Sequence, residues 1–328
     1  MNYDFIAIGD LVTDAFIQMK DAEVHCKIDK TACELCVRFG DKVPYESVTV
    51  LNGVGNSPNG AVCAARLGLN TALISDLGDD RIASETLAYL KEVKVASEFI
   101  TKHRDFKSNY HYVLWYGDDR TILIKHEAYP YKLPEIGSPK WLYVSSLGQH
   151  ALEYQKDLMR YLVQHPEIKM AFQPGTFQMK LGFDELRVMY ERAQIFFCNT
   201  DEARLMLDTN EMNGANLAEM ISHHGPKNVV ITDGPNGAYL YDSHMKWFMP
   251  PYPDPKPPYE RTGAGDAFSS TITACVAMGM DIHDAMLWAP VNSMSVVQKI
   301  GAQAGLLSQE EIKRWLEKAP VDYKLQRV

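Results

Sequence analysis

The chain has 328 residues, 46% of them hydrophobic, and a formal net charge of −9 at pH 7. This length and composition are ample for a large hydrophobic core. They are consistent with one α/β layer structure that carries an appended element. The acidic balance argues against nucleic acid or an anionic membrane as partner, because such partners select basic patches. Small molecules are therefore the expected ligands.

The segment 1–9 lacks the basic region and long apolar run of a signal peptide, and it predicts a first β-strand instead. No stretch approaches the roughly 18 consecutive apolar residues of a membrane span. We therefore expect a cytoplasmic protein.

The six cysteines do not make a disulfide framework in a chain of this size, and a cytoplasmic location would keep them reduced. Cys63, Cys198 and Cys275 lie in apolar segments and are expected in the core. A separate cluster contains His25, Cys26, Cys33 and Cys36. A zinc or redox site stays open there, although one C-x-x-C without a second pair is a weak pattern.

Asp14 is the first functional candidate in chain order, five residues beyond the strand-ending Gly9. Ligands of open α/β sheets bind beyond the carboxyl ends of strands, so Asp14 is placed to reach a substrate hydroxyl. Stabilisation of a turn would explain the same residue equally well.

Residues of about 15–51 and 106–127 do not continue a regular strand and helix alternation. They contain runs of β-branched and aromatic residues, which predict a small separate sheet. We expect this sheet to act as a lid on a single domain of residues 1–328.

The loop 52–60 is crowded with glycine, asparagine and proline and leads into a predicted helix over 61–67. Asn59 in this loop offers both a donor and an acceptor to a hydroxylated ligand. A simple helix cap is the alternative.

Strands and helices alternate from residue 71 onward. The predicted strands are 71–75, 141–145, 169–172, 195–198 and 229–232. Such alternation predicts an α/β fold with a doubly wound, mostly parallel sheet flanked by helices.

Two polar loops follow strands of this series. The carboxylates of Asp201 and Glu202 are suited to a hydrated Mg²⁺, which takes only one or two protein carboxylates. The alternative is that these two acidic residues only mark the start of a helix. The Gly-rich segment 232–238 links two strands and would let nucleotide phosphates approach, although a hairpin explains it nearly as well.

The segment Gly263–Asp266 predicts a loop that opens a helix. Its glycines permit sharp turning, and the amides and positive end of the helix make an anion site. Asp266 falls in the first turn, where we expect a low pKa. A base beside an anion site suggests phosphoryl transfer. The alternative is a helix start without a catalytic role, with a Gly-rich entry and an acidic residue in its first turn.

Together these motifs resemble the ribokinase-like, PfkB-type carbohydrate kinases, in order and over essentially the whole chain. The matching segments are Gly9 to Asp14, Gly55-x-x-x-Asn59-x-Ala61, Gly78–Asp80, Asn199-x-x-Glu202, Thr232-x-Gly234-x-x-Gly237 and Gly263–Asp266. The departures from the family pattern are Val12, Val54 and Glu260-Arg261, which leave the substrate open.

The resemblance implies ATP-dependent phosphorylation of an alcohol group, with Mg²⁺. It implies Asp266 as catalytic base and Gly263, Ala264 and Gly265 as anion hole. Substrate contacts would come from Asp14, Gly55, Asn56 and Asn59. Nucleotide contacts would come from Asn199, Glu202, Thr232, Gly234, Gly237 and Asn292, with Glu202 holding magnesium through water. The segment 300–303 resembles the family's monovalent-cation loop, so K⁺ activation is expected.

A small sugar, as in fructokinases or ribokinases, is the first expectation for the acceptor. The alternative is a nucleoside, favoured by lid aromatics able to stack on a base, namely Tyr110, Tyr112, Trp115 and Tyr116. A third reading is a sugar-binding regulator without catalysis. We also expect a homodimer formed through the lid, since open edge strands otherwise invite uncontrolled pairing.

Overall fold

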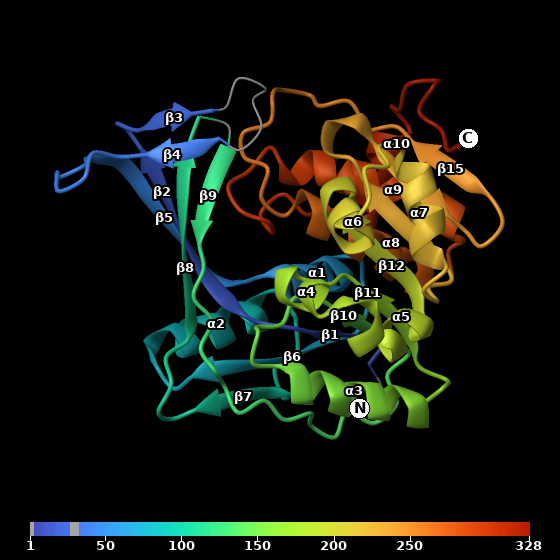
Figure 1. Cartoon of the computed structure of the whole chain (residues 1–328), viewed down its shortest axis with the longest axis horizontal. Helices are drawn as coiled ribbons and strands as arrows, with labels where there is room; N and C mark the ends of the chain where they lie inside the picture. Colours follow the sequence, from blue (N-terminus) through green and yellow to red (C-terminus); the bar gives the residue numbers. More distant parts are fainter. Residues whose placement is uncertain (1–2, 27–32, 118) are drawn as a thin grey trace.

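The computed structural model describes residues 3–26, 33–117 and 119–328, without the side chain of Asp119. A large helix-covered sheet and a smaller sheet beside it make up the molecule (Figure 1). Within the described ranges, no helix combines the length and apolar character needed to cross a bilayer.

The central sheet has ten strands. In spatial order they are β16 (Gln326–Arg327), β15 (Lys246–Met249), β14 (Ala238–Tyr241), β13 (Val229–Thr232), β12 (Ala193–Asn199), β11 (Lys169–Phe172), β10 (Trp141–Val144), β1 (Phe5–Ile8), β6 (Thr71–Gly78) and β7 (Ile100–His103). All neighbours from β13 to β7 are parallel, and β14, β15 and β16 add antiparallel pairs. This confirms the predicted doubly wound, mostly parallel sheet.

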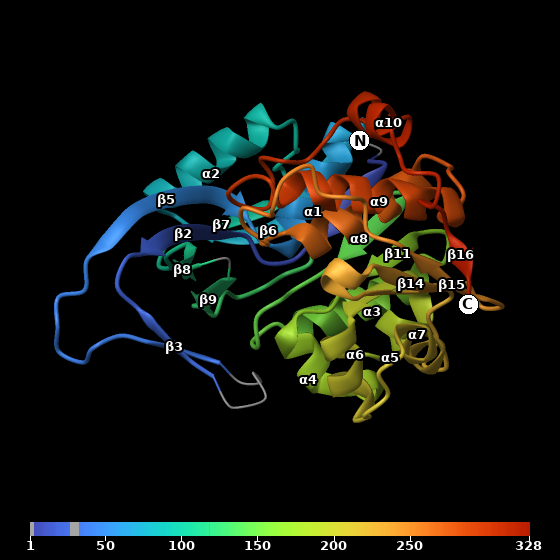
Figure 2. The same cartoon turned by 90° about the horizontal axis from the view of Figure 1, so that it is seen from above.

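Helices cover both faces of this sheet (Figure 2). On one face lie α1 (Asn56–Arg66), α2 (Arg81–Glu92), α8 (Ala264–Ala277), α9 (Ile282–Val296) and α10 (Gln309–Leu316). On the other lie α3 (Leu152–Gln164), α4 (Thr176–Glu185), α5 (Arg187–Arg192), α6 (Thr200–Leu207) and α7 (Gly214–Ser222). Because both faces are covered, β1 and β10 are continuously apolar and wholly buried rather than alternating.

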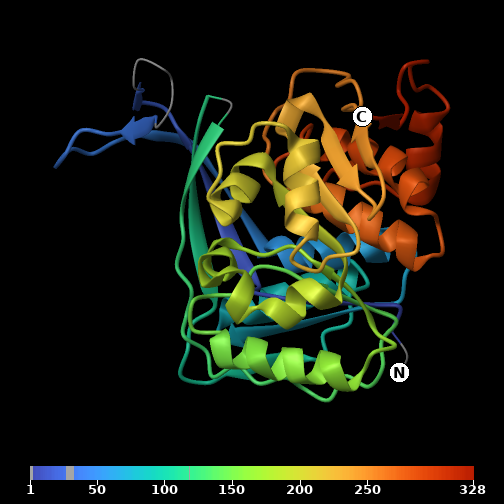
Figure 3. The same cartoon turned by 45° about the vertical axis from the view of Figure 1, so that its right-hand side comes forward.

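A separate four-stranded sheet, called here the lid sheet, stands beside the central sheet (Figure 3). Its order is β5 (Tyr45–Val54), β2 (Val12–Met19), β8 (Asn109–Tyr116) and β9 (Asp119–Leu123). These strands come from the two segments set apart in the sequence. However, β2 begins at Val12 and β5 ends at Val54, because both strands run directly into the loops that join them to β1 and α1.

The short hairpin of β3 (Glu23–His25) and β4 (Glu34–Cys36) corrects the expectation that every cysteine is reduced. Antiparallel pairing of His25 with Glu34 brings the next residues together, and Cys26 forms a disulfide with Cys33. Cys36 is free. In the described part of the chain no three side chains group as a metal site, so the zinc alternative gains no support.

Candidate active site

The start of α8 is built as the glycine pattern predicts. Gly263 caps the helix with φ 80°, a left-handed conformation that favours glycine. A Cβ there would lie 2.1 Å from the Cβ of Ala302, so no larger residue fits without displacement. Ala264 and Gly265 follow in the first turn and line a cavity. The start of α8 therefore forms part of the cavity wall, and an anion site at its backbone amides stays a prediction.

Asp266 lies in the same turn and is buried, and three side-chain amides donate to its carboxylate. Asn56 and Gln173 donate to Oδ1 at 2.9 and 3.1 Å, and Asn59 donates to Oδ2 at 2.7 Å. Burial raises the pKa of Asp266, while the amide donors oppose that rise. The expected low pKa was therefore wrong, because the loss of solvent outweighs the helix terminus.

The loop before α1 aims two of these amides. Gly55 has φ 119°, and a Cβ on it would lie 2.7 Å from the carbonyl oxygen of Asp10, so the loop passes directly over the end of β1. Asn56 and Asn59, predicted to bind substrate, instead direct their Nδ2 atoms at Asp266. They orient the carboxylate in this structure, and contact with a substrate stays a prediction.

Gln173 is a site residue that the sequence analysis missed. It follows β11 directly, and its Oε1 accepts a hydrogen bond from Ser269 at 2.7 Å while its Nε2 donates to Asp266. Its position at the carboxyl end of a parallel strand was the available signal.

Asn199 and Glu202 lie side by side at the start of α6. Glu202 Oε2 accepts from the Asn199 amide at 2.9 Å, and Asn199 Oδ1 accepts from the Glu202 amide at 2.8 Å, forming a capping box. Burial raises the pKa of Glu202, and the negative charges of Asp266 and Asp201 raise it further. Both residues line a cavity of about 290 Å³ that also contains Asp266.

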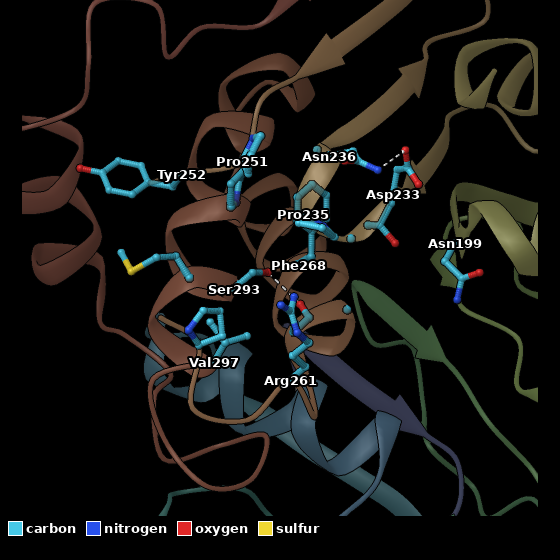
Figure 4. Close-up of a pocket in the computed structure, with 18 of the residues that line it drawn as sticks. Asn199, Asp233, Pro235, Asn236, Pro251, Tyr252, Arg261, Phe268, Ser293 and Val297 are labelled. Atoms are coloured by element: carbon cyan, nitrogen blue, oxygen red, sulfur yellow. Dashed lines mark hydrogen bonds between the residues drawn. The ribbon is translucent and has the colours of Figure 1, made fainter. Parts of the chain in front are cut away.

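A larger cavity of about 560 Å³ opens beside the α8 turn (Figure 4). Its walls include Asn199, Thr232, Gly234, Gly237, Pro251, Tyr252, Ala264, Phe268, Ser293 and Val297. The turn between β13 and β14 contains a short 3₁₀ helix, Gly234–Asn236, and Gly237 has φ 114°. The predicted nucleotide residues Asn199, Thr232, Gly234 and Gly237 are thus together on one cavity.

Asn292 does not belong to this cavity. Its side chain is fully buried, donates to Thr271 Oγ1 at 2.8 Å and accepts from the Leu307 amide at 2.9 Å. The neighbouring Ser293 lines the cavity instead. Asn292 is therefore a core residue rather than a cavity residue, because the helical rotation of α9 turns its side chain inward.

Arg120 on β9 is a second residue missed from sequence. It lines both cavities, its charge lowers the pKa of Asp266, and its Nε lies 3.7 Å from Glu260 Oε1. The lid sheet therefore brings a cation to the space beside the carboxylate. Arg120 pairs with Trp115 across β8 and β9. Which cavity its side chain lines depends on how the lid sheet packs against the central sheet, which the sequence does not reveal.

The segment 300–303 packs against the α8 loop and α1. The Gly301 amide donates to Glu260 Oε2 at 3.4 Å, and Gln303 Nε2 donates to Asn59 Oδ1 at 2.8 Å. This segment supports the Asn59 amide that holds Asp266. Activation by K⁺ stays a prediction.

On the lid side, Asp14 is buried on β2 and its Oδ1 lies 3.4 Å from His111 Nδ1. Asp10, after β1, is also buried, and its Oδ2 lies 2.7 Å from His126 Nδ1. The structure thus surrounds the predicted substrate carboxylate with groups that the sequence did not single out.

Comparison with known proteins agrees with this geometry. The profile of the pfkB family carbohydrate kinases matches residues 25–309. The ribokinase of Bacillus subtilis (strain 168) is 25% identical over 303 residues, covering 89% of this chain and 98% of that protein. The 5-dehydro-2-deoxygluconokinase of the same organism is 26% identical over 300 residues, covering 83% of this chain and 89% of that protein.

Solved structures share the fold. A nucleoside kinase of Methanocaldococcus jannaschii superposes with a TM-score of 0.78 at 18% identity, covering 97% of this chain and 100% of that one. A candidate ribokinase II from E. coli, in complex with ATP and Mg²⁺, gives a TM-score of 0.75 at 17% identity, covering 97% of this chain and 100% of that chain.

The protein is a phosphotransferase that acts on an alcohol group of a sugar. The family profile spans most of its length, and the chain belongs to the pfkB family of carbohydrate kinases.

Proposed function

We propose that the protein transfers the γ-phosphoryl group of ATP to a hydroxyl of a small sugar, with Asp266 as catalytic base. The observation that carries this proposal is the placement of Asp266. It is a buried carboxylate in the first turn of α8, held by three amides, and it lines the same cavity as Glu202 and the glycine loop.

The raised pKa suits Asp266 to its task. A carboxylate whose pKa lies above the usual value binds a proton more readily, and a base need not be strong when the proton leaves late in phosphoryl transfer. The amides of Asn56, Asn59 and Gln173 fix the direction of the carboxylate. The α8 amides then stabilise charge on the transferring oxygens.

The larger cavity fits a nucleotide in size and chemistry. Its volume of about 560 Å³ lies in the range of small-molecule sites, and it combines apolar walls with the glycine turn and the α8 amides. Glu202 and Asn199 supply the oxygen ligands that suit a largely hydrated Mg²⁺, which would neutralise phosphate charge. Arg120 would bind the same phosphates from the lid side.

A coupled ADP-release assay with Mg²⁺-ATP tests the proposal, using ketoses, aldoses, sugar acids, sugar phosphates and nucleosides, with and without K⁺. We expect turnover with a sugar and a loss of about 10²–10⁴-fold in kcat for Asp266→Asn. Full activity of a folded Asp266→Asn variant would refute the assignment of Asp266 as the catalytic base. Absence of turnover with detectable sugar binding would indicate the regulatory alternative.

Two of the four lid aromatics give the nucleoside alternative no support. In the lid sheet Asp14 stands opposite His111, whereas Tyr112 stands opposite Ala15 and therefore projects from the other face. Tyr112 is exposed, and Trp115 is buried against the ring of Tyr259. Tyr112 is thus outward-facing and Trp115 is packed within the lid, and a sugar remains the proposed acceptor.

We also propose a homodimer formed through the outer face of the lid sheet. Val48 and Val50 on β5, Tyr112 on β8 and Leu123 on β9 are each 48–52% exposed. Their register places Val50, Tyr112 and Leu123 in one row across the sheet. A contiguous apolar face of this kind is typical of a protein interface.

A cytoplasmic location is proposed as well, since ATP is the phosphoryl donor. The Cys26–Cys33 disulfide is the observation that weighs against a reducing compartment.

A further inference from the structure

Two carboxylate and imidazole pairs lie where the lid sheet meets the end of β1. Asp10 pairs with His126 at 2.7 Å, and Asp14 pairs with His111 at 3.4 Å. The two imidazole rings are 5.2 Å apart, so the pairs form one cluster. We call these four residues the acceptor cluster.

The acceptor cluster is largely buried but incompletely hydrogen-bonded. Asp10 and Asp14 are only 5% and 8% exposed. Tyr131 donates to Asp10 Oδ1 at 2.9 Å, whereas His111 Nε2 has no hydrogen-bond partner within the described ranges. A buried polar atom without a partner calls for an explanation, and a bound hydroxyl group would supply one.

The cluster lies beside the loops that hold Asp266. The loop residue Gly55 passes so closely over Asp10 that a Cβ would contact its carbonyl oxygen, and the next residue, Asn56, donates to Asp266. From the other side, the ring of Phe177 lies 6.1 Å from that of His126, four residues after Gln173. The cluster and the base are therefore bordered by the same two loops.

The surroundings of the cluster are electronegative. Burial raises the pKa of Tyr131, and the charges of Asp10 and Asp76 raise it further. Asp76 itself is paired with His103 at 2.6 Å. The partners recorded for Asp10 and Asp14 in the described chain are imidazoles and a phenol. Hydroxyl groups can donate to such carboxylates and accept from such imidazoles, whereas an anion finds no excess positive charge.

Building on the sugar kinase function above, we propose that the acceptor is an uncharged polyhydroxyl sugar and that the Asp10–His126 pair sets this preference. Sugar acids and sugar phosphates are rejected because their charge would lie against the two carboxylates.

Binding tests this inference independently of turnover. Isothermal titration of the whole protein with a non-hydrolysable ATP analogue present would compare matched pairs: D-ribose with D-ribose 5-phosphate, D-fructose with D-fructose 6-phosphate, and D-glucose with D-gluconate. For the pair whose neutral member binds most tightly, we expect its charged member to bind at least about 10-fold more weakly. Asp10→Asn and His126→Gln should each weaken neutral-sugar binding by about 10–100-fold, and Asp10→Asn, which removes one of the two carboxylates, should narrow the difference in affinity between neutral and charged sugars.

His165, a partly buried residue that caps the C-terminal end of α3 and pairs with Glu167, offers the matched control His165→Gln, which should leave all affinities unchanged. Charged sugars binding as tightly as neutral ones, or more tightly, would overturn the inference even if the protein proves an active kinase. A folded Asp10→Asn variant that discriminates between neutral and charged sugars as strongly as the parent protein would also overturn it. Neutral-sugar preference without any ADP release would uphold this inference while refuting the proposed catalysis.

Discussion

On the nucleotide side of Asp266, cavity groups come from short loops of the central sheet: the β13–β14 turn, the start of α6 and the start of α8. On the lid side, polar contacts join elements far apart in the chain, as Asp10 with His126 and Glu260 with Arg120 do. Under the proposed function, the nucleotide side would act mainly through backbone amides and the lid side through side chains. Substitutions should therefore affect the two sides differently.

The largest expected effect is that of Gly263→Ala on the nucleotide side. The left-handed φ of 80° and the 2.1 Å contact with Ala302 mean that the loop must shift. We expect a stability loss of about 2–4 kcal/mol and a loss of about 10²–10³-fold in kcat. Chemical denaturation and the ADP-release assay would measure both.

Gly265→Ala is the matched control in the same turn. A Cβ there meets no atom within 4 Å, so the free energy of unfolding should stay unchanged. Equal destabilisation by the two substitutions would show that the conformation of Gly263 is not the critical feature.

Arg120→Ala on the lid side should have the next largest effect. Its guanidinium lines both cavities, so its removal should lower kcat by about 10²–10³-fold, with Arg120→Lys intermediate. Steady-state kinetics in ATP would measure this. An unchanged kcat in the folded Ala variant would remove Arg120 from phosphate binding and leave it as a partner of Glu260 only.

These two cases show what the sequence could reveal. Gly263 and Asp266 were identified because a glycine turn at a helix start has a local signature with a physical cause. Gln173 and Arg120 were missed because their roles depend on which strand ends meet and on the register between β8 and β9. The low pKa expected for Asp266 failed for the same reason, since burial is a tertiary property.

The pH dependence of kcat/KM separates burial from amide support at Asp266. Protonated Asp266 cannot accept a proton, and its pKa is raised, so activity should fall on acidification at a pH above the usual aspartate range. Asn56→Ala removes a donor that lowers this pKa, and it should therefore shift the acid limb to higher pH. Asn216→Ala on α7 serves as control, and an acid limb that does not move in Asn56→Ala would contradict the assignment.

The smallest effect on catalysis should come from Val50→Asp on the outer face of the lid sheet. Val50 lies in the exposed apolar row with Tyr112 and Leu123, and a charge there would be buried without a partner in the proposed dimer. Sedimentation equilibrium should show a dimer for the parent protein and a monomer for the variant. The exposed Val163 on α3 supplies the control Val163→Asp, which should remain dimeric.

Because Val50 faces away from Asp14 and Asp266, the kcat of Val50→Asp should change less than about threefold if the lid orders within each subunit. A large fall in kcat on dissociation would instead mean that the lid of the partner subunit holds Arg120 in place. The lid side of the site would then depend on dimer formation, whereas the nucleotide side would be complete within one chain.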